Sequence, residues 1–292
     1  MTRLIDPKIM IAIRDLALAA KTTVDGFLAG IHNSNVKGVG MEFSQYRSYQ
    51  AGDDLRRLDW KLFARSDRYY IRESEIETSI SVKFLIDASA SMNHEDTGIS
   101  KIEFARYLAA SLAWLAHLQG DETGLHVFRD NTLFSLPARK DHQHLSRIFF
   151  QLEQIDATGN FTESVNYKSL FTTGARKELL IFITDYYEKG DEISKLLHSL
   201  ASNRHEIIVF HLMGKNELDL SFPGNAVFED FETGRTITVN AEKGRRLYQE
   251  KLQKHLEKIR TELLDKKIFY RLLKMDEPIE VALRDFLIRR NK

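Results

Sequence analysis

The chain has 292 residues, of which 43% are hydrophobic and 29% charged, so it can bury a substantial core and is not expected to be disordered. Its 42 basic residues balance 42 acidic ones, which weighs against nucleic acid as a partner. It contains no cysteine, which excludes disulfides and thiolate metal sites. The apolar runs are shorter than the ~20 residues that span a bilayer, and the amino terminus lacks a signal-peptide pattern. We therefore expect a cytoplasmic protein without a membrane span.

Residues 1–78 are expected to form an amino-terminal extension. Pro7 predicts a helix over residues 8–20, and a stretch rich in Gly, His, Asn and Ser predicts a loop over residues 26–40. Residues 69–80 alternate in part between apolar and polar, which predicts a strand. The main domain is expected to follow over residues 79–292.

Within the extension, residues 42–65 form a block in which acids, arginines and aromatic residues are interleaved. The arginines and rings could bind phosphate or single-stranded nucleic acid, and the aspartates could hold a metal. Alternatively, the charges form internal salt bridges with the main domain, and their close alternation favours this interpretation. The block is retained as a candidate interaction surface, made of Arg47, Asp53, Asp54, Arg56, Asp59, Trp60 and Arg65.

The main domain alternates apolar strands with amphipathic helices. Near-continuous apolar runs predict buried strands at 82–86, 179–183 and 207–212. Apolar residues recurring every three or four positions predict helices at 101–119, 142–155 and 191–201. This order predicts a doubly wound α/β fold, with a mostly parallel sheet and helices on both faces. A β-hairpin insertion is expected at about 222–240, because two short β runs flank a turn there.

An acid and two hydroxyls follow the strand 82–86 at alternate positions: Asp87, Ser89 and Ser91. Alone, they fit a metal site or a turn and helix cap equally well. Asp185 follows the strand 179–183, and Thr162 lies in a loop expected at the same edge, where ligands bind to parallel sheets. Together they form an all-oxygen set suited to Mg²⁺, with Mn²⁺ and Ca²⁺ as alternatives. Two acids do not enclose a divalent cation, so an open position for an outside carboxylate is expected.

The sequence gives less support to nucleotide binding or catalysis. No strand is followed by the glycine fingerprint G-x-G-x-x-G, and the phosphate-binding pattern G-x-x-x-x-G-K-[ST] does not occur. A metal-dependent hydrolase would need a general base beside the cation, for which Asp185 and His94 are available. No recognisable nucleophile–base pair accompanies them. We assign no catalytic residue, and a phosphoesterase-like hydrolase is the alternative function.

The residues Asp87-Ala-Ser89-Ala-Ser91, Thr162 and Asp185 resemble the metal-ion-dependent adhesion site of von Willebrand factor type A domains. The resemblance implies the fold of those domains. It also implies that the two serines and the threonine bind the cation directly, and that the aspartates act in or near the coordination shell. A carboxylate of a partner protein would then complete the coordination.

The block from Arg47 to Arg65 is similar to the signature of the bacterial family known as domain of unknown function 58. Residues 228–234, 276–278 and 283–287 resemble later parts of that family. Its members are typically encoded beside MoxR-type AAA+ ATPases, which implies a role with such a chaperone. The partner that supplies the acidic ligand is expected to be a MoxR-type ATPase or another protein. We therefore expect a non-enzymatic, divalent-cation-dependent protein-interaction module.

Overall fold

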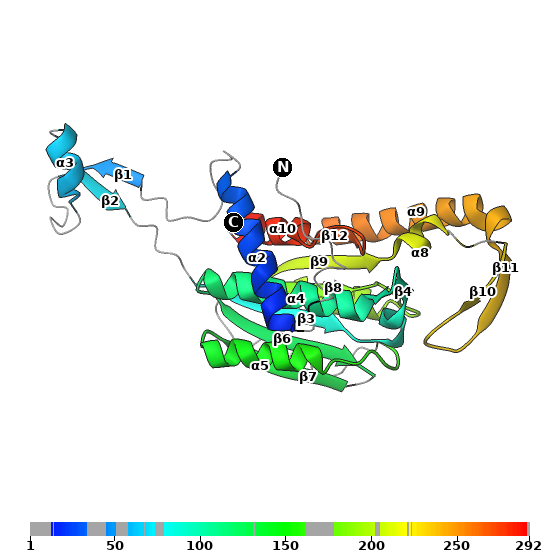
Figure 1. Ribbon diagram of the computed structural model, residues 1–292. Coiled ribbons are helices and arrows are strands. Elements are labelled where there is room, and N and C mark those ends of the chain that lie inside the picture. Colours follow the sequence, from blue (N-terminus) through cyan, green and yellow to red (C-terminus); the bar gives the residue numbers. More distant parts are fainter. Residues whose placement is uncertain are drawn as a thin grey trace. The chain divides into compact units, whose positions relative to one another are not determined.

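The computed structural model describes residues 13, 15–33, 45–50, 58–66, 68–73, 79–130, 132–161, 178–201, 205–220, 222 and 224–290. The chain divides into two compact units. The sheet unit comprises residues 1–35 and 79–292, and the small unit comprises residues 36–78. Figure 1 shows the elements of both units in the order of the chain.

The sheet unit is built on a six-stranded sheet in the order β12-β9-β8-β3-β6-β7. Its strands are β3 (Ser81–Asp87), β6 (Glu122–Arg129), β7 (Thr132–Arg139), β8 (Glu178–Thr184), β9 (Glu206–Met213) and β12 (Phe269–Lys274). Only β7, at one edge, runs antiparallel to its neighbour in this sheet. β3 lies between β6 and β8, and its residues from Val82 to Asp87 are buried. Burial on both faces explains its near-continuous apolar sequence.

Helices cover both faces of the sheet (Figure 1). On one face lies α4, with three helices packed around it; these are α4 (Lys101–Leu118), α2 (Leu16–Asn33), α5 (His142–Glu153) and α10 (Glu280–Arg290). On the other lie α7 (Glu192–Ala201) and α9 (Ala241–Asp265), which bury Ile193 and Leu263 against Leu180 and Val209 of the sheet. This is the predicted doubly wound α/β architecture. Among the described helices, none is both long and apolar enough to cross a membrane.

β3 and β8 form the switch point of the sheet. The chain leaves β3 toward β6 but leaves β8 toward β9, on the opposite side. The crevice at the carboxyl ends of two such strands is where ligands bind to open α/β sheets. After β3, the 3₁₀ turn η2 (Ala90–Asn93) and the short strands β4 (Glu95–Asp96) and β5 (Ile99–Ser100) lead into α4. Ser100 starts α4 by accepting a hydrogen bond from the Glu103 amide.

Between β9 and α9 the chain forms a short helix and a hairpin. These elements are α8 (Lys215–Asp219), β10 (Asn225–Glu229) and β11 (Thr236–Asn240). β10 and β11 pair antiparallel within the range expected for an insertion. Gly234 has a φ of 67° in the turn that joins them, a left-handed conformation that favours glycine. The hairpin ends where Asn240 caps α9 through the Lys243 amide.

The small unit contains β1 (Gln45–Ser48), α3 (Trp60–Ser66) and β2 (Tyr70–Glu73), and β1 pairs antiparallel with β2. Asp59 caps α3 by accepting a hydrogen bond from the Leu62 amide at 2.9 Å. Phe63 stacks on Tyr69 with ring centroids 4.5 Å apart. Among the described residues of this unit, the aromatic rings contribute to the packing.

Two expectations for the amino-terminal region require correction. First, α2 continues through Gly26 and Gly30 to Asn33, so this part of the expected loop is helical. Each glycine costs about 1 kcal/mol relative to alanine in a helix, but α2 packs on α4 and buries Val24 completely. Second, α2 belongs to the sheet unit. The expected extension 1–78 is therefore divided between the sheet unit, which includes residues 1–35, and the small unit, residues 36–78.

Candidate functional site

Asp87, the last residue of β3, is fully buried at the switch point. Its Oδ1 accepts a hydrogen bond from the Ser89 amide at 3.0 Å, and its Oδ2 accepts one from the Thr184 hydroxyl at 2.7 Å. Both donors are uncharged. Burial, together with the negative charge of Asp185, raises the pKa of Asp87 to about 7. The site therefore destabilises the ionised form of this carboxyl.

The predicted serines lie beside Asp185. The Ser89 and Ser91 hydroxyl oxygens are 3.1 Å apart, and Ser91 donates a hydrogen bond to Asp185 Oδ1, also at 3.1 Å. The turn η2 brings the two serines together, while Asp185 comes from the end of β8. The structure thus places Asp87, Ser89, Ser91 and Asp185 in one cluster. Thr162, the fifth predicted ligand, lies outside the described residues.

Sequence reasoning missed Lys101 and Glu217. The buried ammonium of Lys101 lies 3.1 Å from Asp185 Oδ2 and 2.7 Å from Glu217 Oε1. Burial lowers the pKa of Lys101, but the charges of these two carboxylates raise it overall. One signal could have revealed this residue, because a cation in the first turn of α4 opposes the helix dipole. Such a lysine indicates a specific acidic partner.

The charges of this network do not balance. When ionised, Asp87, Asp185 and Glu217 carry three negative charges, and Lys101 supplies one positive charge. Counting these carboxylates and Lys101 alone, the network is short of two positive charges, which a divalent cation would supply; His94 Nε2 also lies 3.7 Å from Glu217 Oε2. Its carboxylate and hydroxyl oxygens are also the donors that Mg²⁺ prefers. Among the described residues, no three His, Cys, Asp or Glu side chains come together as a metal-binding group, here or elsewhere, so the serine hydroxyls would have to supply part of the coordination. The residues of the cluster fit a hard divalent cation.

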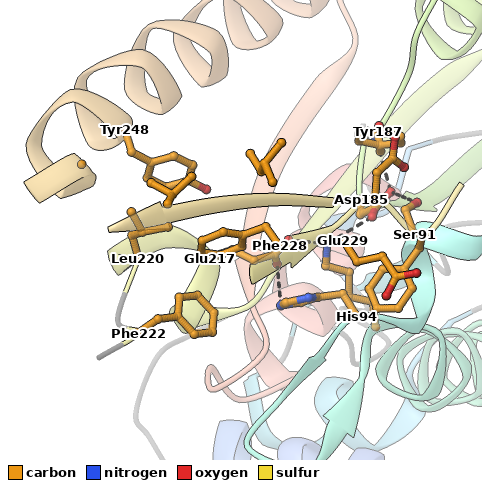
Figure 2. Close-up of a pocket in the computed structure, with 16 residues that line it drawn as sticks. Ser91, His94, Asp185, Tyr187, Glu217, Leu220, Phe222, Phe228, Glu229 and Tyr248 are labelled. Carbon is orange, nitrogen blue, oxygen red and sulfur yellow. Dashed lines mark hydrogen bonds and ion pairs between the residues drawn. The ribbon is translucent and has the colours of Figure 1, made fainter. Parts of the chain in front are cut away.

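Beside this cluster a cavity of about 410 Å³ extends under the hairpin (Figure 2). Its polar end includes Ser91, Asp185 and Lys101, and its other end is lined by aromatic and aliphatic side chains of the segment after α8, the hairpin and α9. His94 lies in the wall, with its Nε2 2.9 Å from Asn216 Oδ1. The candidate metal site thus opens into a pocket of mixed character.

The structure describes only some residues of the small unit's block. Of its candidate residues, Asp59 caps α3, Trp60 is 60% exposed and Arg65 is exposed. Arg47 lies in β1. Outside the described residues are Asp53, Asp54 and Arg56. The block therefore presents at least one large exposed aromatic side chain, and its role as an interaction surface stays a prediction.

Several known proteins are similar to this chain. Mb1516 of Mycobacterium bovis and Rv1480 of Mycobacterium tuberculosis, both described as uncharacterized proteins, are each 28% identical over 232 residues, covering 78% of this chain and 73% of theirs. Among solved structures, BatB from Bacteroides thetaiotaomicron is 18% identical with a TM-score of 0.46, covering 73% of this chain and 99% of that chain. The SpRpn10 VWA domain is 10% identical with a TM-score of 0.41, covering 71% and 95%.

The mostly parallel six-stranded sheet with helices on both faces is the doubly wound α/β architecture that the resemblance to von Willebrand factor type A domains implies. The model of the family described as protein of unknown function DUF58 matches residues 45–258. The match includes both the small unit's block and the cluster at the switch point. The chain belongs to the DUF58 family.

Proposed function

We propose that the protein binds a divalent cation at the carboxyl ends of β3 and β8 and uses it to hold an acidic side chain of a partner protein. One observation carries this proposal. Asp87 and Asp185 are both buried, and the charge of one raises the pKa of the other, in a network short of two positive charges. Such a deficit is costly inside a protein unless a cation relieves it.

The residues around the deficit have separate tasks. Ser89, Ser91 and Asp185 would hold the cation, together with Thr162. Asp87 would fix the loop through its bonds to the Ser89 amide and the Thr184 hydroxyl, and its charge would favour the cation. When bound, the cation would attract a carboxylate from outside, which the acids of the site repel without it. Partner binding should therefore require the metal.

A MoxR-type AAA+ ATPase is the partner that the family resemblance favours. The proposed role is that of a binding module or adaptor that presents a cation to an acidic residue of the ATPase. A metal-dependent hydrolase would instead use a base such as His94, which shares the cavity with Ser91 and Asp185. Its ring is tied to α8 through Asn216, so we place binding before hydrolysis. Metal-dependent hydrolysis that is lost in Ser89→Ala would reverse this order.

The proposal can be tested with a MoxR-type ATPase encoded in the same genome. The immobilised protein should retain the ATPase in Mg²⁺ and release it in EDTA. Asp87→Ala should retain little in either condition, whereas the matched exposed change Glu250→Ala on α9 should behave as the wild type. Circular dichroism establishes that each variant is folded. Equal retention by wild type and Asp87→Ala, in both Mg²⁺ and EDTA, would refute the proposal.

A further inference from the structure

The cavity beside the candidate metal site has an apolar end, which we call the hairpin recess. It is lined by Leu220, Phe222, Phe228, Ile237, Val239 and Tyr248. Figure 2 shows Leu220, Phe222 and Tyr248 at one side of the view and Ser91, Asp185 and Tyr187 at the other. At about 410 Å³, the cavity is within the ~300–1,000 Å³ typical of ligand pockets. It is large enough to take a bulky side chain together with an adjoining polar group.

One face of the hairpin is turned toward the recess. Phe228 pairs with Ile237, and Ala226 pairs with Val239, so these side chains share a face. Phe228, Ile237 and Val239 line the cavity. Ile237 is nevertheless 62% exposed. The chain therefore leaves apolar surface uncovered on the side of the hairpin that faces the metal site.

The hairpin is fastened at both ends, so the recess is already formed. At its tip, Lys189 Nζ lies 2.9 Å from Glu232 Oε2, and the Tyr187 hydroxyl donates a hydrogen bond to Asp230. Tyr187 and Lys189 belong to the loop that follows Asp185. At its base, the Ala241 amide donates to the Gly224 carbonyl at 2.9 Å. The loop after β8 thus supplies Asp185, a candidate metal ligand, and also holds the hairpin that covers the recess.

Charge decides what can occupy the polar end. Asp185, Glu217 and Glu229 line the cavity, where Lys101 is the opposing cation. An incoming carboxylate is repelled there until a divalent cation binds. Apolar contact in the recess has no such requirement. Binding of a partner therefore divides into a metal-dependent part and an apolar part that lie side by side.

We propose that the hairpin recess receives a large apolar side chain, aromatic or aliphatic, from the partner segment whose carboxylate binds the cation. This inference rests on the proposed function and adds the class of partner. The partner is a protein segment in which an acidic residue lies within a few positions of a bulky apolar residue. The cation at the metal cluster would then bind the acidic side chain, and the hairpin would contact the apolar side chain.

The test begins with short random peptides displayed on phage, selected on the full-length protein in Mg²⁺ and eluted with EDTA. The selected sequences should combine an acid with a nearby Phe, Trp, Tyr, Leu or Met. Selected sequences without a bulky apolar residue would overturn the proposal. Selection of basic aromatic sequences that stay bound in EDTA would also overturn it, because these peptides would bind the acidic side chains of the cavity without a cation.

A labelled peptide of the selected sequence then reports on the recess. Ile237→Ser should weaken its binding in Mg²⁺ about tenfold or more, as expected for the loss of a hydrophobic pocket contact. Val227→Ser is the matched control, because Val227 lies on the same hairpin, is 67% exposed and is absent from the cavity lining. It should bind the peptide as the wild type does. Equal binding by Ile237→Ser and wild type, or failure to recover any magnesium-dependent peptide, would overturn the recess.

Titration of Mg²⁺ without peptide separates the two proposals. Normal Mg²⁺ binding by Ile237→Ser, with weakened peptide binding, assigns the loss to the recess. Normal Mg²⁺ binding by the wild type, with peptide binding unaffected by Ile237→Ser, overturns the recess and leaves the proposed function standing. Absence of Mg²⁺ binding by the wild type overturns the proposed function itself.

Discussion

Two fully buried aspartates of the same sheet have different hydrogen-bond partners, one at the amino ends of the parallel strands and one at their carboxyl ends. Asp121 directly precedes β6, and Asp87 ends β3, which runs parallel to β6; both side chains belong to residues that are 0% exposed. Arg290 donates two hydrogen bonds to the Asp121 carboxylate, at 2.6 and 3.0 Å. Asp87 receives its two bonds from an amide and a hydroxyl. The chain thus neutralises one buried acid and leaves the other without a direct cation.

The difference assigns the two aspartates separate roles, Asp121 in stability and Asp87 in the proposed function. At the amino edge, the Asp121–Arg290 pair fastens the last helix to the sheet and is complete without any ligand. At the carboxyl edge, the acids exceed the nearby cation, and the pKa of Asp87 rises to about 7. An unbalanced buried charge is a cost to folding. Its presence at the switch point, where ligands bind to open α/β sheets, is the basis of the proposed cation site.

Removing the charge of Asp121 should have the largest effect on stability. Asp121→Asn leaves the guanidinium of Arg290 buried, with only 8% of its side chain exposed, and removes the carboxylate that it pairs with. Loss of one partner from a buried pair costs about 3–5 kcal/mol. Urea denaturation of wild type and variant in EDTA measures the loss. A cost under about 1 kcal/mol would show that the buried charge of Asp121 is no better paired than that of Asp87.

The same substitution at the other edge should behave differently. In EDTA, Asp87→Asn removes a buried charge that has no direct cationic partner, so the free energy of unfolding should change by less than about 1 kcal/mol or increase. Saturating Mg²⁺ should stabilise the wild type, by about 2.7 kcal/mol at a hundred times the dissociation constant. It should not stabilise Asp87→Asn. A loss in EDTA as large as that of Asp121→Asn would contradict the comparison.

The pH dependence of stability should isolate Asp87. Its folded pKa of about 7 exceeds the ordinary value of 3.8, so the folded state binds the extra proton between these values. The resulting stability is fully present below the ordinary value and is lost as the pH rises through about 7. In EDTA, the wild type should therefore lose stability relative to Asp87→Asn over this window.

Subtracting the two profiles removes the contribution of buried histidines, which has the opposite sign. Burial lowers the pKa of His126 to about 4 and that of His211 to about 3. Both residues therefore cost stability as the pH falls below their ordinary value. A difference profile that stays flat from about pH 4 to pH 8 would show that Asp87 ionises without penalty.

The smallest effect is expected from the ion pair at the hairpin tip. Lys189 pairs with Glu232 as Arg290 pairs with Asp121, but the Lys189 side chain is 41% exposed. The Glu232 side chain is only 3% exposed, but burial raises the pKa of its carboxyl, so protonation can relieve the loss of the lysine. Lys189→Ala should therefore cost about 1 kcal/mol in urea denaturation, near the upper end for exposed pairs and below the cost of breaking a fully buried pair. Glu232→Gln, which keeps the shape of the partner, is the control. A loss comparable to that of Asp121→Asn would mean that the hairpin is integral to folding of the sheet unit.

The sequence predicted those parts of the fold and site that depend on local pattern. The apolar runs of β3 and β8 were predicted because strands buried on both faces are continuously apolar. Asp87, Ser89, Ser91 and Asp185 could be grouped because parallel strands end at a common edge. Binding of metal by these residues stays a prediction.

Other features depend on contacts that no local pattern records. Lys101 and Glu217 are 116 residues apart, and Asp121 and Arg290 are 169 apart. The helix α2 was missed over residues 26–33 because its glycines lower the local propensity, whereas packing on α4 stabilises it. Tertiary contacts thus decided both the charge balance of the site and the boundary of the amino-terminal helix.

Calorimetric titration of Mg²⁺ into the full-length protein tests the central claim most directly. The account predicts saturable binding of one cation per chain to the wild type and to Val227→Ser. Ser91→Ala and Asp87→Asn should lose this binding while remaining folded, because they remove a proposed ligand oxygen and a charge of the cluster. Absence of saturable binding to the wild type at millimolar Mg²⁺, or equal binding by wild type and Ser91→Ala, would contradict the account.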